Sequence, residues 1–217
     1  MLSKNLFDFL ILIPAYNEEK TIGKIVKNAL RFGDVLVVND ASNDKTKKNA
    51  IHEGAIVINH KKNLGYNLAI DTGLRFFLKK KYKNIIILDA DGQHPIEYIK
   101  DFKKYLLQKY DVICGVRSKT TRIGEKIFIK FSKILWKLKD PLCGMKGYSK
   151  FFLKLHYKPF NYNFISTEYV IKASKEKIKI KQITINNKPR KDQSRFGEGV
   201  SVNFLIIFTL IKCLIFI

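Results

Sequence analysis

Short β-rich runs alternate with helical stretches through the first half of the chain, and this alternation limits the folds that the chain can adopt. The apolar runs occupy residues 10–13, 35–38, 56–58, 85–88 and 112–114. Helical patterns lie between them, near residues 18–32, 44–53, 66–80 and 96–109. Strands that alternate with helices of this length predict an α/β fold with a mostly parallel sheet and helices on both faces.

The fourth apolar run ends in two aspartates that stand two residues apart. Residues i and i+2 of an extended segment point to the same side, so Asp89 and Asp91 can face one cation. Open α/β sheets bind their ligands at the carboxyl ends of the strands. Carboxylate oxygens suit Mg²⁺ or Mn²⁺, and these ions suit a diphosphate. The alternative for this segment is a solvated Asp-x-Asp-Gly turn.

The composition favours an anionic partner and a reducing environment. Lysine and arginine total 41 against 19 acidic residues, which gives a formal charge of +22. Such a field attracts nucleic acid, an anionic membrane face or phosphorylated substrates. Because no DNA-binding or RNA-binding signature is present, we expect no nucleic-acid partner. The three cysteines are far apart, so a disulfide framework is not expected.

Residues 122–138 predict a basic amphipathic helix. In helical projection the apolar side chains of this segment share one arc. Another arc carries four lysines, Lys126, Lys130, Lys133 and Lys137. A lysine stripe beside an apolar face is typical of helices at a membrane interface. An ordinary helix packed on the core is the alternative.

The C-terminal segment 200–217 is apolar apart from Ser201, Asn203, Thr209 and Lys212. It is short for a bilayer span, which needs about 20 residues. We therefore interpret it as a terminal helix that is embedded in a membrane or lies on one. A buried core helix is the alternative. The expected organisation is an α/β domain over residues 1–199 and a membrane-associated helix over residues 200–217.

Five motifs follow one another at the ends of the expected strands. They occupy residues 11–19, 37–46, 63–73, 89–94 and 115–117. This series resembles the family 2 glycosyltransferases of the GT-A fold, over about residues 8–200. More narrowly, it is similar to the branch of dolichyl-phosphate mannosyltransferases and bacterial polyprenyl-phosphate glycosyltransferases. Motifs at the carboxyl ends of parallel strands converge on one crevice.

The resemblance implies where a nucleotide-sugar donor binds. In the family, the loop after the first strand and an aspartate after the second strand contact the nucleoside. The matching donor residues are Pro14, Ala15, Tyr16, Glu18, Asn39 and Asp40, with Asp89, Ala90 and Asp91 near the diphosphate. Asn39 stands where the family usually has the first of two aspartates, so position 39 keeps hydrogen-bonding capacity and loses a charge.

The resemblance also implies a divalent metal, Mg²⁺ or Mn²⁺, that bridges the diphosphate. The family's metal ligands correspond to Asp89, Asp91 and Gln93. The metal would neutralise the charge that develops on the departing nucleoside diphosphate. His94 is a ligand by residue type, and packing beside the site is its alternative role.

The fifth motif and two segments further along the chain complete the expected crevice. Arg117 matches the residue that grips the acceptor's phosphate, since a guanidinium pairs bidentately with phosphate. Residues 140–149 resemble a family loop that opens with an aspartate, so Asp140 is a candidate for ordering the acceptor. Residues 189–197 resemble a basic loop over the diphosphate, in which Arg190 and Arg195 would bind phosphate.

These motifs together predict inverting transfer of a sugar from a nucleotide-sugar to a polyprenyl phosphate, such as dolichyl or undecaprenyl phosphate, at the cytoplasmic face of a membrane. The catalytic set is Asp89, Asp91, Arg117 and Asp140. A phosphate acceptor is already ionised near neutral pH, so positioning and electrostatics carry the step. The alternative acceptor is a sugar hydroxyl in cell-surface glycan synthesis, with Asp140 as the general base.

Overall fold

The structure is a computed structural model, described for residues 8–120, 122–158, 165–188 and 200–217. A seven-stranded sheet forms the centre of this part, in the order β3-β2-β1-β4-β6-β5-β7. The strands are β1 (Phe9–Ala15), β2 (Asp34–Asn39), β3 (Ile56–Asn59), β4 (Asn84–Ile87), β5 (Val112–Arg117), β6 (Lys146–Ser149) and β7 (Ile180–Ile185). Only β6 runs antiparallel to its neighbours, β4 and β5. The predicted mostly parallel sheet is confirmed.

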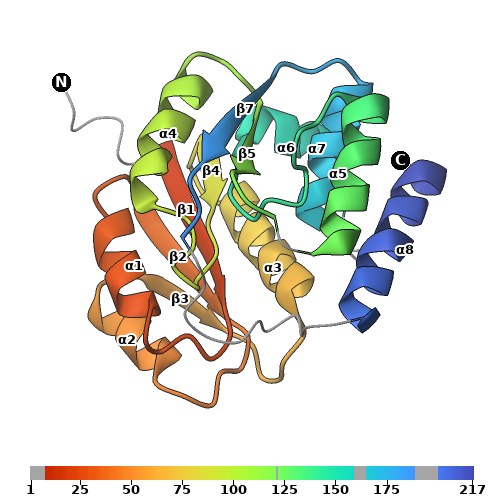
Figure 1. The fold of residues 1–217 in the computed structure, drawn as a ribbon. Helices are drawn as coiled ribbons and strands as arrows, with labels where there is room; N and C mark the ends of the chain where they lie inside the picture. The colour runs from red at the N-terminus through yellow and green to blue at the C-terminus, as the bar shows by residue number, and fades with distance from the viewer. Residues whose placement is uncertain (1–7, 121, 159–164, 189–199) are drawn as a thin grey trace.

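Helices cover both faces of the sheet (Figure 1). One face carries α1 (Ile22–Ala29), α2 (Thr46–His52) and α4 (Ile99–Leu107), which follows the short 3-10 helix η2 (Ile96–Tyr98). The other face carries α3 (Tyr66–Lys79), α5 (Ile123–Trp136), α6 (Lys150–His156), α7 (Ile165–Lys175) and α8 (Val200–Phe216). The prediction of helices on both faces is also confirmed.

Strand β1 is buried along its whole length because helices cover it from both sides. Leu10 and Leu12 pack in the apolar cluster on the α3 side, whereas Ile11 and Ile13 pack in the cluster on the α1 side. Helix α3 approaches closely at Gly73, where a Cβ atom would overlap the side chain of Leu12. An apolar central strand therefore requires a small residue on the helix that covers it.

Helix α1 is shorter than the helix predicted at residues 18–32. Asn17 adopts a left-handed backbone with φ of 53°, and the helix begins only at Ile22. The residues between them form a loop at the carboxyl end of β1. This part of the prediction is wrong because the polar residues bond to a neighbouring loop instead of starting a helix.

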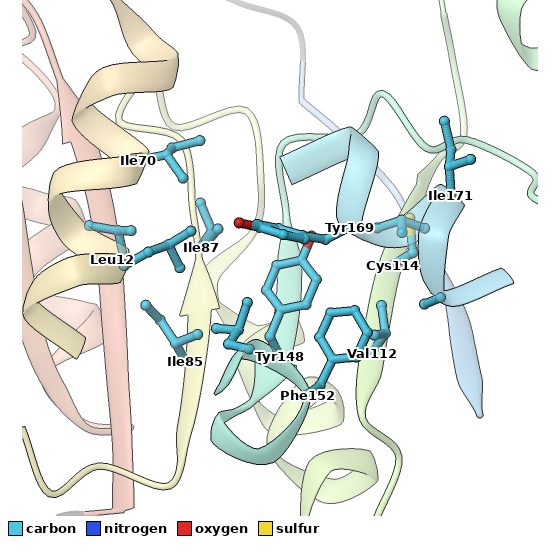
Figure 2. Packing of buried hydrophobic residues seen from close by; sticks show 14 of the residues in the cluster. Leu12, Ile70, Ile85, Ile87, Val112, Cys114, Tyr148, Phe152, Tyr169 and Ile171 are labelled. Atoms are coloured by element: carbon cyan, nitrogen blue, oxygen red, sulfur yellow. The ribbon is translucent and has the colours of Figure 1, made fainter. Parts of the chain in front are cut away.

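Tyr148 of β6 joins the sheet to the helices on the α3 side. It is fully buried, and its hydroxyl donates to the Ser166 carbonyl at 2.7 Å. Its ring centroid lies 6.0 Å from the centroids of Phe152 and Tyr169. Figure 2 shows these rings beside Ile85 of β4, which is the register partner of Tyr148. The cluster fixes α6 and α7 against the sheet.

Helix α8 packs on α5 and presents a second, exposed apolar face. The Gly124 N–H donates to Asn203 Oδ1 at 2.8 Å, and a Cβ at Gly124 would lie 3.0 Å from that oxygen. Its buried residues include Val202, Ile206, Leu210 and Cys213, and its exposed ones include Phe204, Phe208, Ile211, Leu214 and Ile215. In the described part of the chain no helix has the length and apolarity to cross a membrane. The relation of residues 200–217 to a membrane stays a prediction.

Glu168 of α7 makes the stability of the protein depend on pH. Burial raises the pKa of Glu168 from 4.5 to about 7, against a smaller opposing effect of Lys212 on α8. A raised pKa in the folded state means that stability is fully present below about pH 4.5 and is lost as the pH rises towards 7. We expect Glu168→Gln to raise the melting temperature at pH 8 by about 3 °C, with solvent screening taken into account.

The same substitution should have little effect at pH 4.5, where Glu168 is already protonated in the folded state. Exposed Glu97 provides the control, since Glu97→Gln makes the same charge change away from α7. Calorimetric melting curves at both pH values measure the effect. Equal melting temperatures for wild type and Glu168→Gln at pH 8 would contradict the prediction.

Candidate active site

The loops that follow β1 and β2 are bonded to each other. The backbone N–H of Asn17 donates to Ser42 Oγ at 2.9 Å, and Asn43 N–H donates back to Asn17 Oδ1 at 2.9 Å. The Glu18 N–H donates to Thr46 Oγ1 at 2.7 Å. These bonds form a fixed rim at the carboxyl ends of two central strands.

The same rim is tied to the Asp-x-Asp segment. Thr21 Oγ1 donates to the Ala90 carbonyl at 2.7 Å and lies 3.2 Å from Glu18 Oε2. Glu18 and Ala90 are both buried. Pro14 and Ala15 end strand β1, and Ala15 is the register partner of Asn39. The structure therefore brings these residues, which are predicted to bind the nucleotide-sugar, to one edge of the sheet together with half-buried Tyr16.

Asn39 uses both ends of its amide inside the protein. Its Nδ2 donates to Asn59 Oδ1 at 2.5 Å, and its Oδ1 accepts from Ser42 Oγ at 2.5 Å. The residue is only 1% exposed. A buried amide can bridge a donor and an acceptor at the same time, whereas a carboxylate can only accept. Asn39 thus joins β2 to β3 without a buried charge.

Asp40 holds the loop that leads into α3. Its carboxylate accepts from Leu64 N–H at 2.8 Å and from Gly65 N–H at 2.7 Å. His60 Nδ1 lies 2.7 Å from Asp40 Oδ1, and His60 Nε2 lies 2.9 Å from Thr72 Oγ1. Asp40 is 3% exposed. In the structure these bonds of Asp40 fix the start of α3. Contact between Asp40 and a nucleoside stays a prediction.

Asp89 is held in place from two sides. Tyr66, the first residue of α3, donates its hydroxyl proton to Asp89 Oδ1 at 2.7 Å. Burial and the negative charge of Asp89 both raise the pKa of Tyr66, so the phenol stays a donor. On the other side Asp89 Oδ2 lies against the backbone of Gly144, where any Cβ would overlap it. The carboxylate has one orientation before any ligand arrives.

The residues at this edge fit a divalent metal of the Mg²⁺ or Mn²⁺ type. Asp89 is partly exposed, and Asp91 Oδ1 accepts the Gln93 N–H at 3.0 Å. The described residues hold no group of three His, Cys, Asp or Glu side chains suited to a metal ion. Two carboxylates and the Gln93 amide oxygen would be three hard oxygen ligands, fewer than the six that Mg²⁺ takes, so the other positions would be left to a ligand or water.

His94 lies beside this set and is buried. Its Nδ1 is 3.6 Å from Asp89 Oδ2, and within the described residues that nitrogen has no hydrogen-bond partner. Its Nε2 lies 3.7 Å from Cys143 Sγ. His94 therefore lies beside Asp89 with one ring nitrogen directed at its carboxylate, and a role for His94 as a ligand stays a prediction.

Arg117 forms a buried ion-pair network at the end of β5. Its Nε and Nη2 donate to the two oxygens of Asp140 at 2.8 and 3.0 Å, and its Nη1 donates to Glu125 Oε1 at 3.1 Å. Burial lowers the pKa of Arg117, but its bonds to Asp140 and the charge of Glu125 outweigh this and raise it. The structure thus brings Arg117 and Asp140 together as predicted candidates, and it adds Glu125.

Three residues of this edge, Tyr66, Gly144 and Lys146, were not predicted individually as site residues, although they lie within the motifs at residues 63–73 and 140–149. Lys146 is 1% exposed, and its Nζ donates to the Cys143 carbonyl at 2.6 Å and to Ser166 Oγ at 3.2 Å. Burial lowers the pKa of Lys146. A lysine inside a short strand gives no periodic signal, so no pattern predicted that Lys146 would be buried. Arg190 and Arg195, the predicted phosphate ligands, lie outside the described residues.

Solved structures share this architecture. Glucosyl-3-phosphoglycerate synthase from Mycobacterium tuberculosis, in complex with phosphoglyceric acid, superposes with a TM-score of 0.77 at 18% sequence identity. The match covers 95% of this chain and 80% of that one. Another structure of the same enzyme contains Mn²⁺, uridine diphosphate and phosphoglyceric acid, at a TM-score of 0.77 and 17% identity over 95% and 78% of the two chains. At these identities the likeness shows the α/β GT-A fold.

Residues 10–165 match the family described as glycosyl transferase family 2, and the chain belongs to this family. An uncharacterised protein of Methanocaldococcus jannaschii is 33% identical to this chain. The match covers 96% of this chain and 93% of that protein. UDP-N-acetylglucosamine--dolichyl-phosphate N-acetylglucosaminyltransferase from Methanococcus voltae is 26% identical over 93% and 94% of the two chains. Dolichyl-phosphate hexose transferase from Haloferax volcanii is 25% identical over 92% of each chain.

The bond between Tyr66 and Asp89 leads to a prediction about metal affinity. Tyr66→Phe removes the hydroxyl that orients Asp89, and we expect Mn²⁺ binding in the presence of a nucleoside diphosphate to weaken about tenfold. Isothermal titration measures it. Tyr82→Phe is the matched control, because Tyr82 donates to Asp34 at 2.7 Å at the opposite edge of the sheet. Equal affinity in Tyr66→Phe and Tyr82→Phe would show that the phenol does not orient a metal ligand.

Proposed function

We propose that this glycosyltransferase moves a sugar, with inversion, from a nucleotide-sugar to a polyprenyl phosphate at the cytoplasmic face of a membrane. The observation that carries the proposal is the preset carboxylate of Asp89, paired with Asp91 beside the loops of β1 and β2. Relatives that match over nearly their whole length, and whose names include dolichyl phosphate, support the lipid acceptor.

A divalent metal in this site would be held by Asp89, Asp91 and Gln93. When bound, it would supply positive charge for the leaving diphosphate. Tyr66 and Gly144 fix the direction of Asp89, so little reorganisation would accompany binding. In this proposal the nucleoside binds to the rim formed by Tyr16, Glu18 and the loop after β2. Arg190 and Arg195 bind the phosphates of the donor.

Arg117 is the proposed contact for the acceptor's phosphate. Asp140 and Glu125 hold the guanidinium in one orientation and leave N–H donors of its fork for a further partner. The acceptor phosphate is itself the nucleophile, so the step needs alignment with the sugar and no proton transfer to the protein. Asp140 is then a positioning residue for Arg117.

The hydroxyl-acceptor alternative is less well supported by this geometry. A general base must accept a proton from the attacking hydroxyl. Both oxygens of Asp140 are bonded to Arg117, and Asp140 is 1% exposed. The lipid-phosphate acceptor avoids this requirement.

The membrane side of the proposal rests on α5 and α8. Large apolar residues are exposed along both helices; on α5 they are Ile123, Phe131, Ile134 and Leu135. Lysines accompany them, and anionic lipid surfaces attract such a combination. An exposed apolar surface of this kind marks an interaction site on a folded protein.

The test of the proposal is a transfer assay with a panel of UDP-, GDP- and dTDP-sugars. Wild-type protein should label polyprenyl phosphate with one of them in the presence of Mg²⁺ or Mn²⁺. Asp91→Asn should lower the rate about a hundredfold or more, because one of two metal-binding carboxylates is lost. Phosphoglyceric acid serves as the soluble comparison acceptor. Transfer only to phosphoglyceric acid, or full activity in excess chelator, would contradict the proposal.

Arg117→Lys separates acceptor binding from structural support. The lysine keeps a charge beside Asp140 but lacks the planar fork, so the KM for polyprenyl phosphate should rise about ten- to a hundredfold. The KM for the donor should stay unchanged. Arg75→Lys is the control, since it alters an Arg–Asp pair on α3 outside the proposed site.

Arg117→Ala should also lower the stability, because Asp140 and Glu125 would remain buried without their partner. Loss of one partner of a buried pair costs about 3–5 kcal/mol, which thermal melting detects. An equal rise of both KM values in Arg117→Lys would assign the guanidinium to the donor diphosphate. Unchanged KM values with a lowered melting temperature would make it a structural residue alone.

A further inference from the structure

A basic cavity lies behind the Arg117 network, between the loop after β5 and helix α5. Its volume is about 610 Å³. Three lysines line it, Lys133, Lys137 and Lys139, together with the polar side chains of Ser118 and Thr120. The apolar side chain of Ile129 completes the α5 wall. No residue of this cavity other than Arg117 and Asp140 has a role in the proposed sugar transfer.

The positive charge of this cavity is not balanced by the protein. The charge of Arg117 is compensated by Asp140, which is the only acidic residue of the lining. Within the described part of the chain, none of the three lysines forms an ion pair with an acidic side chain. Three uncompensated ammonium groups around one hollow, with two hydroxyls, suit a phosphate group.

The remaining turns of α5 indicate what the phosphate is attached to. Lys133 lies in the last turn of α5 and Lys137 follows its end, and between them stand Ile134 and Leu135, which are 70% and 49% exposed. A soluble phosphate compound would gain nothing from contact with exposed aliphatic side chains such as those of Ile134 and Leu135. A lipid presents an anionic phosphate and a hydrocarbon chain together, and it would contact both kinds of side chain.

We propose that this cavity binds the phosphate group of a membrane lipid. Two sources share this chemistry, an anionic phospholipid of the bilayer and the polyprenyl phosphate acceptor itself. The inference rests on the membrane location in the proposed function and does not rest on the metal site. Binding at this cavity would hold α5, and with it Glu125 and Arg117, at the membrane surface.

Lysine acylation followed by mass spectrometry tests the site on the full chain. Vesicles of phosphatidylcholine, with and without phosphatidylglycerol, and inorganic phosphate are the probes. Phosphatidylglycerol should slow the acylation of Lys133 and Lys137 at least about fivefold, the effect of about 1 kcal/mol per lysine. Lys126 and Lys130 are internal controls, because both are exposed on the same helix and neither lines the cavity.

A matched pair of double variants distinguishes the cavity from the general charge of α5. Lys133→Gln/Lys137→Gln and Lys126→Gln/Lys130→Gln each remove two positive charges, the first from the C-terminal end of α5 and the second from its middle. Binding to phosphatidylglycerol vesicles should weaken at least about fivefold more in the first variant than in the second. Equal weakening, combined with equal acylation of all four lysines, would overturn the proposed site.

A transfer assay in neutral detergent identifies the source of the phosphate. A raised KM for polyprenyl phosphate in Lys133→Gln/Lys137→Gln alone would assign the cavity to the acceptor. Unchanged transfer with lost vesicle binding would assign it to a bilayer phospholipid. Because vesicle binding and acylation need no sugar donor, failure of the wild type to transfer sugar would count against the proposed function and leave the lipid site standing.

Discussion

The carboxylate of Asp40 determines the geometry of the candidate site without contacting the proposed metal ligands itself. Two backbone N–H groups and a histidine occupy it at the end of β2, and this fixes the loop at residues 60–65. The loop ends at Gly65, whose φ of 89° sets the direction of α3. Because α3 begins there, Tyr66 reaches across to Asp89. Asp40, which follows β2, thus helps to orient Asp89, which follows β4.

The opposite side of Asp89 depends on a buried lysine. Lys146 bonds to the Cys143 carbonyl and to Ser166, and so holds the turn that contains Gly144. Burial of an ammonium is unfavourable unless hydrogen bonds satisfy it, and the lowered pKa of Lys146 reflects that cost. The antiparallel strand β6 makes this contact available, since it inserts between β4 and β5. The orientation of Asp89 therefore depends both on the parallel strands and on the antiparallel strand β6.

The sequence predicted the five parallel strands β1 to β5 because each is an apolar run, and it predicted α3 and α5 to within two residues. It also predicted that Asp89, Asp91 and Arg117 lie at one edge, since motifs at strand ends converge, whereas Asp140 was expected there only from the resemblance of residues 140–149. It did not predict β6 or β7. Strand β6 contains a lysine and a glycine, and β7 is a half-exposed edge strand, so neither has the apolar signal of a central strand. Side-chain partners such as Tyr66 depend on register between distant segments, which no local pattern encodes.

Helices α5 and α8 share one physical feature that links fold and function. Each buries one apolar face and exposes another, so each satisfies the core while leaving aliphatic surface outside. Packing alone does not require the outer face, because polar residues there would leave the contact between Gly124 and Asn203 intact. Glu125 stands one residue beyond that contact and bonds to Arg117. The surface proposed to meet the lipid and the guanidinium proposed to meet its phosphate are thus joined through a single turn of α5.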